Sequence, residues 1–326
     1  MKVDKARKFT DKKLSKMIYR LMKIYKEADA GMRAKLEEYL KALDKQIPNR
    51  IQELQAAIAS GDAAAIKKAQ EVLRDTILHQ TPVKKIYDDM ILQTAERMSN
   101  TNETALKYIN GELPPIYAQN YNQIGNNIQA AVQGYSFDIV NEQTVRQLTV
   151  LDKQLMLPPK KIDRVKDVKW NTRTINNQIL QGIIQGESVG QMADRLTTVT
   201  NMNRAAAVRN ARTMVTAAEN RGRLAGMEQA ESNGVVLKKQ WMSTHDNRTR
   251  DTHAAIDGQM RDPDKPFSNG LLYPGDYAGA PSEVYNCRCT MVTQIIGYRN
   301  SDGTISYVGD IDRYSPTYFK KEGDKK

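Results

Sequence analysis

A helical pattern of apolar residues, running from about residue 10 to residue 47, constrains the fold of this chain more than any other feature. The apolar side chains recur at steps of three and four residues, which places them on one face of an α-helix. The series begins with Leu14, Met17, Ile18, Leu21, Ile24, Tyr25 and Ala28. Pro48 ends the pattern, because proline interrupts a helix. We therefore expect a chain built around long helices.

Turn and capping residues divide the rest of the first half into further helices. Ser60-Gly61-Asp62 marks a turn, and Asp62 is a suitable N-cap for a helix that ends at Thr81-Pro82. Helical patterns follow at about 84–110 and 116–133, separated by Pro114-Pro115. The first half is therefore expected to be entirely α-helical.

The second half begins with helices and then changes character. The helical patterns lie near residues 172–185, 188–197 and 203–230. Ser188 is placed to cap the second of them, and Gly234 ends the third. Residues 235–241 and 289–296 are strand candidates on either side of a stretch rich in Pro, Gly and Asp.

These patterns predict a mainly α fold, in which an elongated N-terminal helical region is followed by a helical segment and a small α+β C-terminal module. We expect a long-helix region at residues 1–157, a second domain at 158–297 and a polar tail at 298–326. Long, partly polar helices commonly need a partner to bury their remaining apolar stripe.

The charge of the chain points to a polyanionic partner. The sequence holds 49 basic and 38 acidic residues, a formal net charge of +11. Such a surplus attracts nucleic acid, an acidic protein surface or an anionic membrane. Basic residues follow helical steps along the first helix, at Lys5, Lys8, Lys12, Lys16, Arg20 and Lys23. The 203–230 helix adds Arg204, Arg209, Arg212, Arg221 and Arg223.

Two interpretations of the basic stripe on the first helix stay open. The first is an ordinary solvated helix face, which is what an isolated run of charges usually forms. The second is a phosphate-binding surface, because a row of ammonium groups can displace counterions from nucleic acid without reading its sequence.

The sequence argues against a membrane or secreted protein. No run of about 18 apolar residues is present, so we expect no membrane anchor. The basic N-terminus is not followed by the apolar segment and cleavage site of a signal peptide. The only cysteines, Cys287 and Cys289, are two positions apart. We expect them to stay reduced, in a cytoplasm or in a particle assembled there.

Chemically versatile side chains concentrate between Trp241 and Thr290. They are His245, Asp246, Arg248, Arg250, His253, Asp257, Cys287 and Cys289. One interpretation is a zinc site in which His253, Cys287 and Cys289 are ligands and His245 or Asp246 is the fourth. Cys-x-Cys is, however, a less usual zinc spacing than Cys-x-x-Cys.

The alternative is a hydrogen-bonded polar core in a small, loop-rich domain. Asp246 and Asp257 could pair with Arg248, Arg250 or Arg288, since carboxylates accept two parallel bonds from a guanidinium. Gly258 and Gly275 would supply tight turns, and Trp241 the apolar anchor. In that case the chain needs no cofactor.

The order of these residues resembles a known family. The pattern is W-x-S-x-x-D-x-R-T-R-x-x-H-x-x-x-D-G-Q, then a Pro-Gly, then N-C-R-C beginning at Asn286. It is similar to the phage Mu F-like head-morphogenesis family of minor head proteins, and the preceding helix at Asn210-Ala211-Arg212-Thr213 also fits. The resemblance covers roughly residues 170–296, and its positions are Trp241, Asp246, Arg248, His253, Asp257, Gly258, Asn286, Cys287 and Cys289.

The resemblance implies a few-copy virion component in the capsid interior, built in the host cytoplasm. Portal protein, major capsid protein and double-stranded DNA would be its partners. The 158–297 domain would be the family's head-morphogenesis domain. Several relatives carry Cys-x-x-Cys where this chain has Arg250 and His253, which keeps a metal compatible with the family, although Arg250 removes one ligand here.

Three functions follow as hypotheses. A non-enzymatic virion protein would bind packaged DNA through the stripe and through the arginines of residues 204–223, foremost Arg204, Arg209 and Arg212. A metal-dependent hydrolase or nuclease would use His245, Asp246 and His253, although no recognised catalytic signature such as H-E-x-x-H or a Walker loop is present. An assembly adaptor would bind acidic faces of portal or capsid subunits.

Overall fold

The computed structural model describes residues 4–132, 135–151 and 161–308, which are mainly helical, as predicted. The helices of the first half are α1 (Lys5–Gln46), α2 (Pro48–Ser60), α3 (Ala63–His79), α4 (Thr81–Ala131) and α5 (Glu142–Leu151). The second half contains α6 (Arg164–Ile184), α7 (Val189–Ser232), β1 (Val235–Met242), α8 (Asp251–Ala254), β2 (Met260–Arg261), α9 (Pro281–Val284), β3 (Thr290–Arg299) and β4 (Ile305–Tyr307). None of the described helices combines the length and the apolar character that crossing a membrane requires.

The chain divides into two compact units that are discontinuous in sequence. Unit 1 consists of residues 1–18, 108–160 and 209–326, and unit 2 of residues 19–107 and 161–208. The predicted boundary at residues 157 and 158 lies outside the described residues. The division into three consecutive domains therefore stays a prediction.

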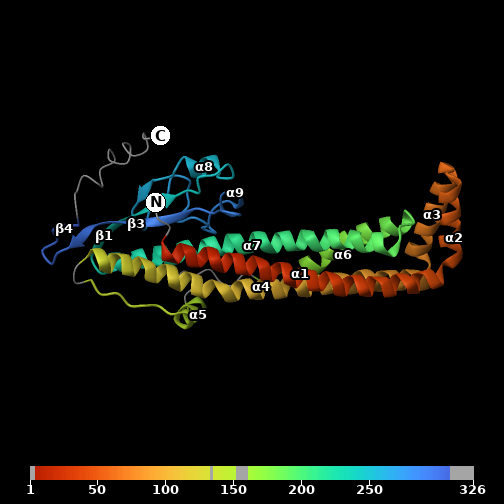
Figure 1. Cartoon of the computed structure of the whole chain (residues 1–326), viewed down its shortest axis with the longest axis horizontal. Helices are drawn as coiled ribbons and strands as arrows, with labels where there is room; N and C mark the ends of the chain where they lie inside the picture. Colours follow the sequence, from red (N-terminus) through yellow and green to blue (C-terminus); the bar gives the residue numbers. More distant parts are fainter. Residues whose placement is uncertain (1–3, 133–134, 152–160, 309–326) are drawn as a thin grey trace. The chain divides into compact units, whose positions relative to one another are not determined.

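Unit 1 holds a small antiparallel sheet in the order β2-β1-β3-β4. Strand β1 pairs with β3 from Val235 opposite Tyr298 to Met242 opposite Thr290, with an irregularity between Val236 and Leu237. Figure 1 shows the short helices α8 and α9 close to this sheet. Both predicted strands are confirmed. Strand β4 lies within the predicted polar tail, of which residues 309–326 are outside the described part.

A hydrophobic core joins the sheet of unit 1 to two of its helices. Side chains from α4, α7 and β1 contribute to it: Ile124, Ile128, Met227, Ala230, Val235 and Leu237. In unit 2, α2 and α3 lie side by side (Figure 1). The turn between them follows the prediction, because Gly61 has a φ of +69° and the Asp62 carboxylate accepts from the Ala64 backbone N–H.

The predicted break at Pro114-Pro115 is wrong, because α4 passes through both prolines. A proline at position 115 cannot donate to the carbonyl of Gly111, the bond that an α-helix would form there. The guanidinium of Arg146 donates to that carbonyl instead, over 2.8 Å. Burial of Leu113, Ile116 and Tyr117 around the prolines also favours the continuous helix.

The predicted separation of helices 188–197 and 203–230 is also wrong, because α7 is continuous. Its start is as expected, since Ser188 and Gln191 each accept a bond from the other's backbone N–H. The polar stretch between the two predicted helices is held by tertiary contacts. Buried Asn203 donates to Asn171 of α6 over 3.0 Å, so its polar character does not signal a turn.

Candidate functional site

The motif block of unit 1 folds around the indole of Trp241 at the end of β1. Trp241 is fully buried in a cluster with Ile256, Phe267, Leu271, Val284, Cys287 and Cys289. Gly258 and Gly275 have φ values of +77° and +84°, the left-handed region that glycine adopts without strain. The motif thus brings residues from both ends of the block to one apolar centre.

His253, Cys287 and Cys289 meet in the interior of this block. The Nδ1 atom of His253 lies 3.4 Å from the Cys289 sulfur and 3.8 Å from the Cys287 sulfur. All three side chains are buried. On the opposite edge of the ring, Nε2 lies 3.0 Å from a carboxylate oxygen of Glu283 in α9. Glu283 is a site residue that sequence analysis missed, because no motif or spacing marks it.

The two cysteines have opposite electrostatic environments. A hydrogen bond from the Cys287 thiol lowers the pKa of Cys289, and His253 and the Thr244 backbone lower it further against the effect of burial. The same bond, together with burial, raises the pKa of Cys287. One of the two sulfurs is therefore far better suited than the other to carry a negative charge.

Helix α7 fixes the backbone of the N-C-R-C segment. The Thr216 hydroxyl donates to the Cys287 carbonyl over 2.6 Å, and the Asn220 amide donates to the Cys289 carbonyl over 3.2 Å. The backbone N–H of Asn286, whose φ is +55°, donates to the Thr213 hydroxyl. The helix that precedes the block in sequence is thus the support on which its last segment is held.

The charged residues of the block form specific pairs. Arg288 donates to both oxygens of Asp246 over 2.5 and 2.6 Å, and these bonds hold the pKa of Asp246 well below its usual range. The exposed Arg248 lies 3.5 Å from the same carboxylate. For Asp257, the arginine pair that the polar-core interpretation allowed is not among the contacts of the described residues. Asp257 accepts from the Ser243 backbone N–H over 2.7 Å.

The residues of the hydrolase hypothesis are placed apart. His245 is 74% exposed and lies 3.4 Å from Asp257, whereas His253 is buried. The Asp246 carboxylate is occupied by Arg288. Among the residues that the structure describes, the group with metal-ligand geometry contains neither His245 nor Asp246. The arrangement therefore offers these three side chains no common reaction centre.

A buried network of ion pairs in unit 1 connects the start of the chain with α7 and β3. Sequence analysis did not predict it. Arg223 is 1% exposed and donates to both oxygens of Asp4 over 2.8 and 3.0 Å. One guanidinium nitrogen of Arg7 donates to both oxygens of buried Glu219, which also accepts from the Thr290 hydroxyl over 2.7 Å. Arg223 was expected to be available for DNA, and this expectation is wrong because its side chain is buried.

A second buried cation, Lys239, lies on β1. Its ammonium donates to the carbonyls of Pro263 and Leu272, over 2.8 Å each, and sits 5.1 Å from the centre of the Phe267 ring. Burial lowers its pKa to about 8, although acidic residues around it act in the opposite direction. This lysine holds the loop after β2 against the sheet.

The lowered pKa of Lys239 predicts that the stability of the protein depends on pH. Between about pH 8 and the ordinary lysine value of 10.5, the unfolded chain keeps a proton that the folded chain has released. The contribution of Lys239 to the free energy of unfolding should therefore rise with pH in this window, by about 3 kcal/mol in total. Urea unfolding should show the parent gaining stability relative to Lys239→Met across the window, because the buried tyrosines that also titrate near pH 10 are common to both proteins and cancel in the difference. Parallel profiles for the two proteins would contradict the prediction.

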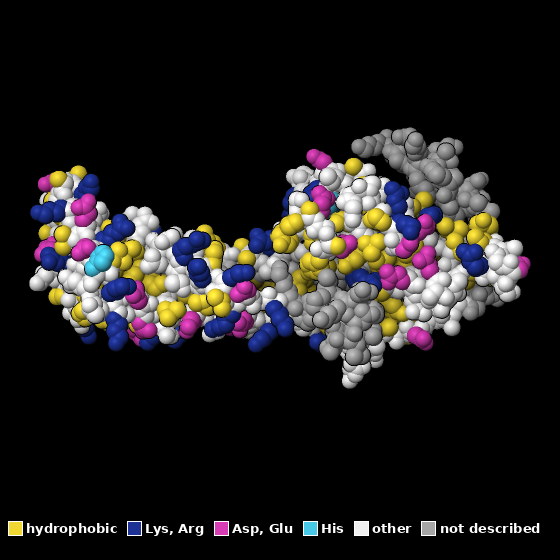
Figure 2. All heavy atoms as spheres, turned by 180° about the vertical axis from the view of Figure 1, so that it is seen from behind, with side chains coloured by type: hydrophobic (Ala, Val, Ile, Leu, Met, Phe, Trp, Pro, Cys, Tyr) yellow, Lys and Arg dark blue, Asp and Glu magenta, His cyan; other side chains and the backbone are white. Residues whose placement is uncertain are grey.

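The cationic residues of the predicted stripe are all exposed. Lys5, Lys8, Lys12, Lys16, Arg20 and Lys23 lie on α1, the first four in unit 1 and the last two in unit 2. Arg209 and Arg212 are exposed on α7, and the Arg209 guanidinium lies 5.8 Å from the Tyr285 ring centre. On the face that Figure 2 shows, Lys and Arg side chains are dispersed among acidic and apolar ones.

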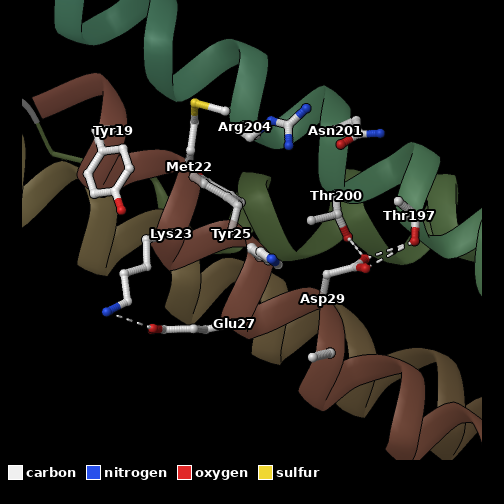
Figure 3. A pocket seen from close by; sticks show the side chains of 12 residues that line it. Tyr19, Met22, Lys23, Tyr25, Glu27, Asp29, Thr197, Thr200, Asn201 and Arg204 are labelled. Atoms are coloured by element: carbon white, nitrogen blue, oxygen red, sulfur yellow. Dashed lines mark hydrogen bonds and ion pairs between the residues drawn. The ribbon is translucent and has the colours of Figure 1, made fainter. Parts of the chain in front are cut away.

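In unit 2 a groove brings Lys23 and Arg204 together, two residues that were predicted to bind DNA. Its volume is about 730 Å³, and it lies between α1 and α7 (Figure 3). Lys26 adds a third cation, and Tyr19 and Met22 add exposed apolar surface. Asp29 is not free to repel an anion, because it accepts from Thr197 and Thr200 and pairs with Arg33.

The motif block lies within a region that is similar to a known protein family. Residues 173–292 match the family model described as "Phage Mu protein F like protein". The chain is 27% identical to "Minor head protein GP7" of Bacillus phage SPP1 over 307 residues, which are 88% of this chain and 92% of that protein. No solved structure matches.

A shorter match concerns an enzyme. Over 127 residues the chain is 32% identical to "NAD(+)--arginine ADP-ribosyltransferase EFV" of Enterococcus faecalis (strain ATCC 700802 / V583). The match spans 38% of this chain and 26% of the transferase. The similarity to SPP1 GP7, in contrast, extends over nearly the whole of both proteins and supports a role as a phage head protein. Residues 173–292 are therefore similar to the phage Mu protein F like family, and the motif block within them is built around Trp241, His253, Cys287 and Cys289.

Proposed function

We propose that this protein is a non-enzymatic minor head protein of the capsid interior, which binds packaged double-stranded DNA without sequence preference. Portal protein and major capsid protein are its protein partners in this proposal, and assembly takes place in the host cytoplasm. The similarity to SPP1 GP7 supports the head role. The observation that carries the DNA proposal is the exposure of all six cations of the α1 stripe.

The electrostatics of the stripe suit a polyphosphate. Lys5, Lys8, Lys12 and Lys16 are exposed at steps of three and four residues on one helix, where they meet solvent and not the core. Lys23 is 3.7 Å from Glu27 and is half-exposed, so DNA phosphate can compete for it. Lysines in such a row bind phosphates as separate point charges, which gives affinity and no base recognition.

The salt dependence of DNA binding tests the proposal. Lys5, Lys8, Lys12 and Lys16 are changed together to Gln, and affinity for a labelled duplex is measured by fluorescence anisotropy over a range of salt concentrations. The parent should bind more weakly as salt rises, and the variant should lose about 0.9 from the log–log slope for each phosphate contact removed. Duplexes of unrelated sequence should give the same result.

A matched variant controls for net charge alone. Lys41, Lys45, Lys67 and Lys68 are also exposed, and changing them to Gln removes the same charge elsewhere. This control should keep the parent slope. Equal losses in the two variants, or no binding by the parent at low salt, would contradict DNA binding through the stripe. Retention of purified portal protein by a parent that ignores DNA would assign the basic surface to portal instead.

A further inference from the structure

We propose that His253, Cys287 and Cys289 bind one zinc ion, which fastens the N-C-R-C segment to the block that follows β1. The site would be structural, because its three side chains are buried beside Trp241. It ties residues that are 34 and 36 positions apart in sequence. This role is separate from DNA binding by α1.

The distances among the three ligand atoms suit a tetrahedral ion. With Zn–S bonds of about 2.3 Å and a Zn–N bond of about 2.0 Å, each nitrogen–sulfur edge of a tetrahedron is about 3.5 Å long. The two edges in the structure are 3.4 and 3.8 Å. All three ligand atoms lie within 4.8 Å of one another. The two nitrogen–sulfur distances therefore suit coordination of all three atoms to one ion.

The imidazole is oriented for metal binding. Nε2 lies 3.0 Å from a Glu283 carboxylate oxygen, although the two groups are not aligned for a hydrogen bond, and a proton on this nitrogen leaves the lone pair of Nδ1 available to the two sulfurs. A carboxylate behind a metal-bound histidine is the usual partner that fixes its tautomer. A single lone pair on Nδ1 can accept a hydrogen bond from only one thiol, whereas an ion accounts for the approach of both sulfurs.

The charge of the three ligands and their number are also consistent with a bound zinc ion. Two thiolates balance the charge of a divalent ion, and Arg250 and Arg288 stand close enough to interact with the sulfurs. Asp246 cannot be the fourth ligand, because Arg288 holds both of its oxygens. Among the described residues no further Cys, His, Asp or Glu joins the group, which leaves the fourth position to a solvent molecule.

Metal content and a cobalt spectrum test the proposal. The full-length protein is purified under reducing conditions without chelator or immobilised metal, and zinc is measured by mass spectrometry. We expect one zinc per chain. After exchange for Co²⁺, thiolate-to-cobalt charge-transfer absorption should appear together with the visible bands of a tetrahedral ion. X-ray absorption of the zinc protein should show sulfur at roughly 2.3 Å.

Three variants separate metal binding from folding. Cys289→Ser should abolish the charge-transfer band or reduce it by half. Glu283→Gln keeps all three ligands and the shape of the site, and should weaken zinc affinity about 10- to 100-fold in a chelator competition. His245→Gln removes the exposed histidine and should change neither measurement. The Glu283 result distinguishes a metal site even if a cysteine variant does not fold.

Two results would overturn the proposal. One is a folded parent with both thiols reduced that contains no zinc and develops no cobalt band, which would assign the cluster to hydrogen bonding alone. The other is loss of the cobalt band in His245→Gln but not in Cys289→Ser, which would move the metal to a different set of ligands. Neither result depends on whether the protein binds DNA.

Discussion

Replacing Arg223 with methionine should lower the free energy of unfolding of the protein by about 3–5 kcal/mol, because it leaves the partly buried Asp4 carboxylate without its cation and leaves buried Glu219 with Arg7 alone. The guanidinium bonds to both oxygens of Asp4 and donates to Asn120 and to the carbonyl of Met291. Glu219 lies 3.7 Å away and is 1% exposed. Methionine fills a similar volume but satisfies none of these acceptors. Urea denaturation followed by circular dichroism measures the loss.

The comparison variant for Arg223 is Arg50→Met. Arg50 pairs with Glu53 over 2.8 Å, and both side chains are about half exposed to solvent. Exposed pairs of this kind contribute roughly 0–1 kcal/mol, so this variant should unfold close to the parent. If Arg223→Met also unfolds within about 1 kcal/mol of the parent, the buried network does not hold α1, α7 and β3 together as inferred.

The sequence predicted those features of the fold that depend on local chemistry. The N-caps Asp62 and Ser188 act as expected, because a side-chain oxygen and a nearby backbone N–H decide the cap. Prolines 114 and 115 misled the prediction, since the donor that replaces the lost helical bond, Arg146, lies more than thirty residues away. Local patterns do not report such a partner.

The candidate site was predictable to a similar extent. The sequence placed His253, Cys287 and Cys289 together, because they are unusual residues close in one block. It gave no reason to add Glu283, one of many carboxylates, or to exclude Arg223 from the DNA-binding surface. The burial of Arg223 depends on Asp4, 219 positions away, and only the packing of α1 on α7 in unit 1 reveals it.

Changing Gly222 to alanine should destabilise unit 1 by about 1–3 kcal/mol, although alanine is the better helix former. Gly222 lies on α7, and a Cβ atom at this position would come within 2.5 Å of the Tyr117 carbonyl oxygen of α4. Gly226, one turn later, faces the Tyr121 carbonyl oxygen at 3.0 Å. The two helices pack so closely that backbone, and not a movable side chain, opposes the added methyl group. Thermal and urea unfolding should both show the loss.

Gly31→Ala is the matched control, because Gly31 is exposed on α1 and a Cβ there would meet nothing within 4 Å. Alanine at this site should stabilise the protein by about 0.5–1 kcal/mol, the usual gain from replacing a helical glycine. Both variants replace a helical glycine with alanine, so the change in helix propensity is the same. If Gly222→Ala destabilises the protein and Gly31→Ala stabilises it, the difference comes from the contact between α4 and α7. A gain at both positions would mean that these helices can separate at no cost, and the close packing inferred for Gly222 would then be wrong.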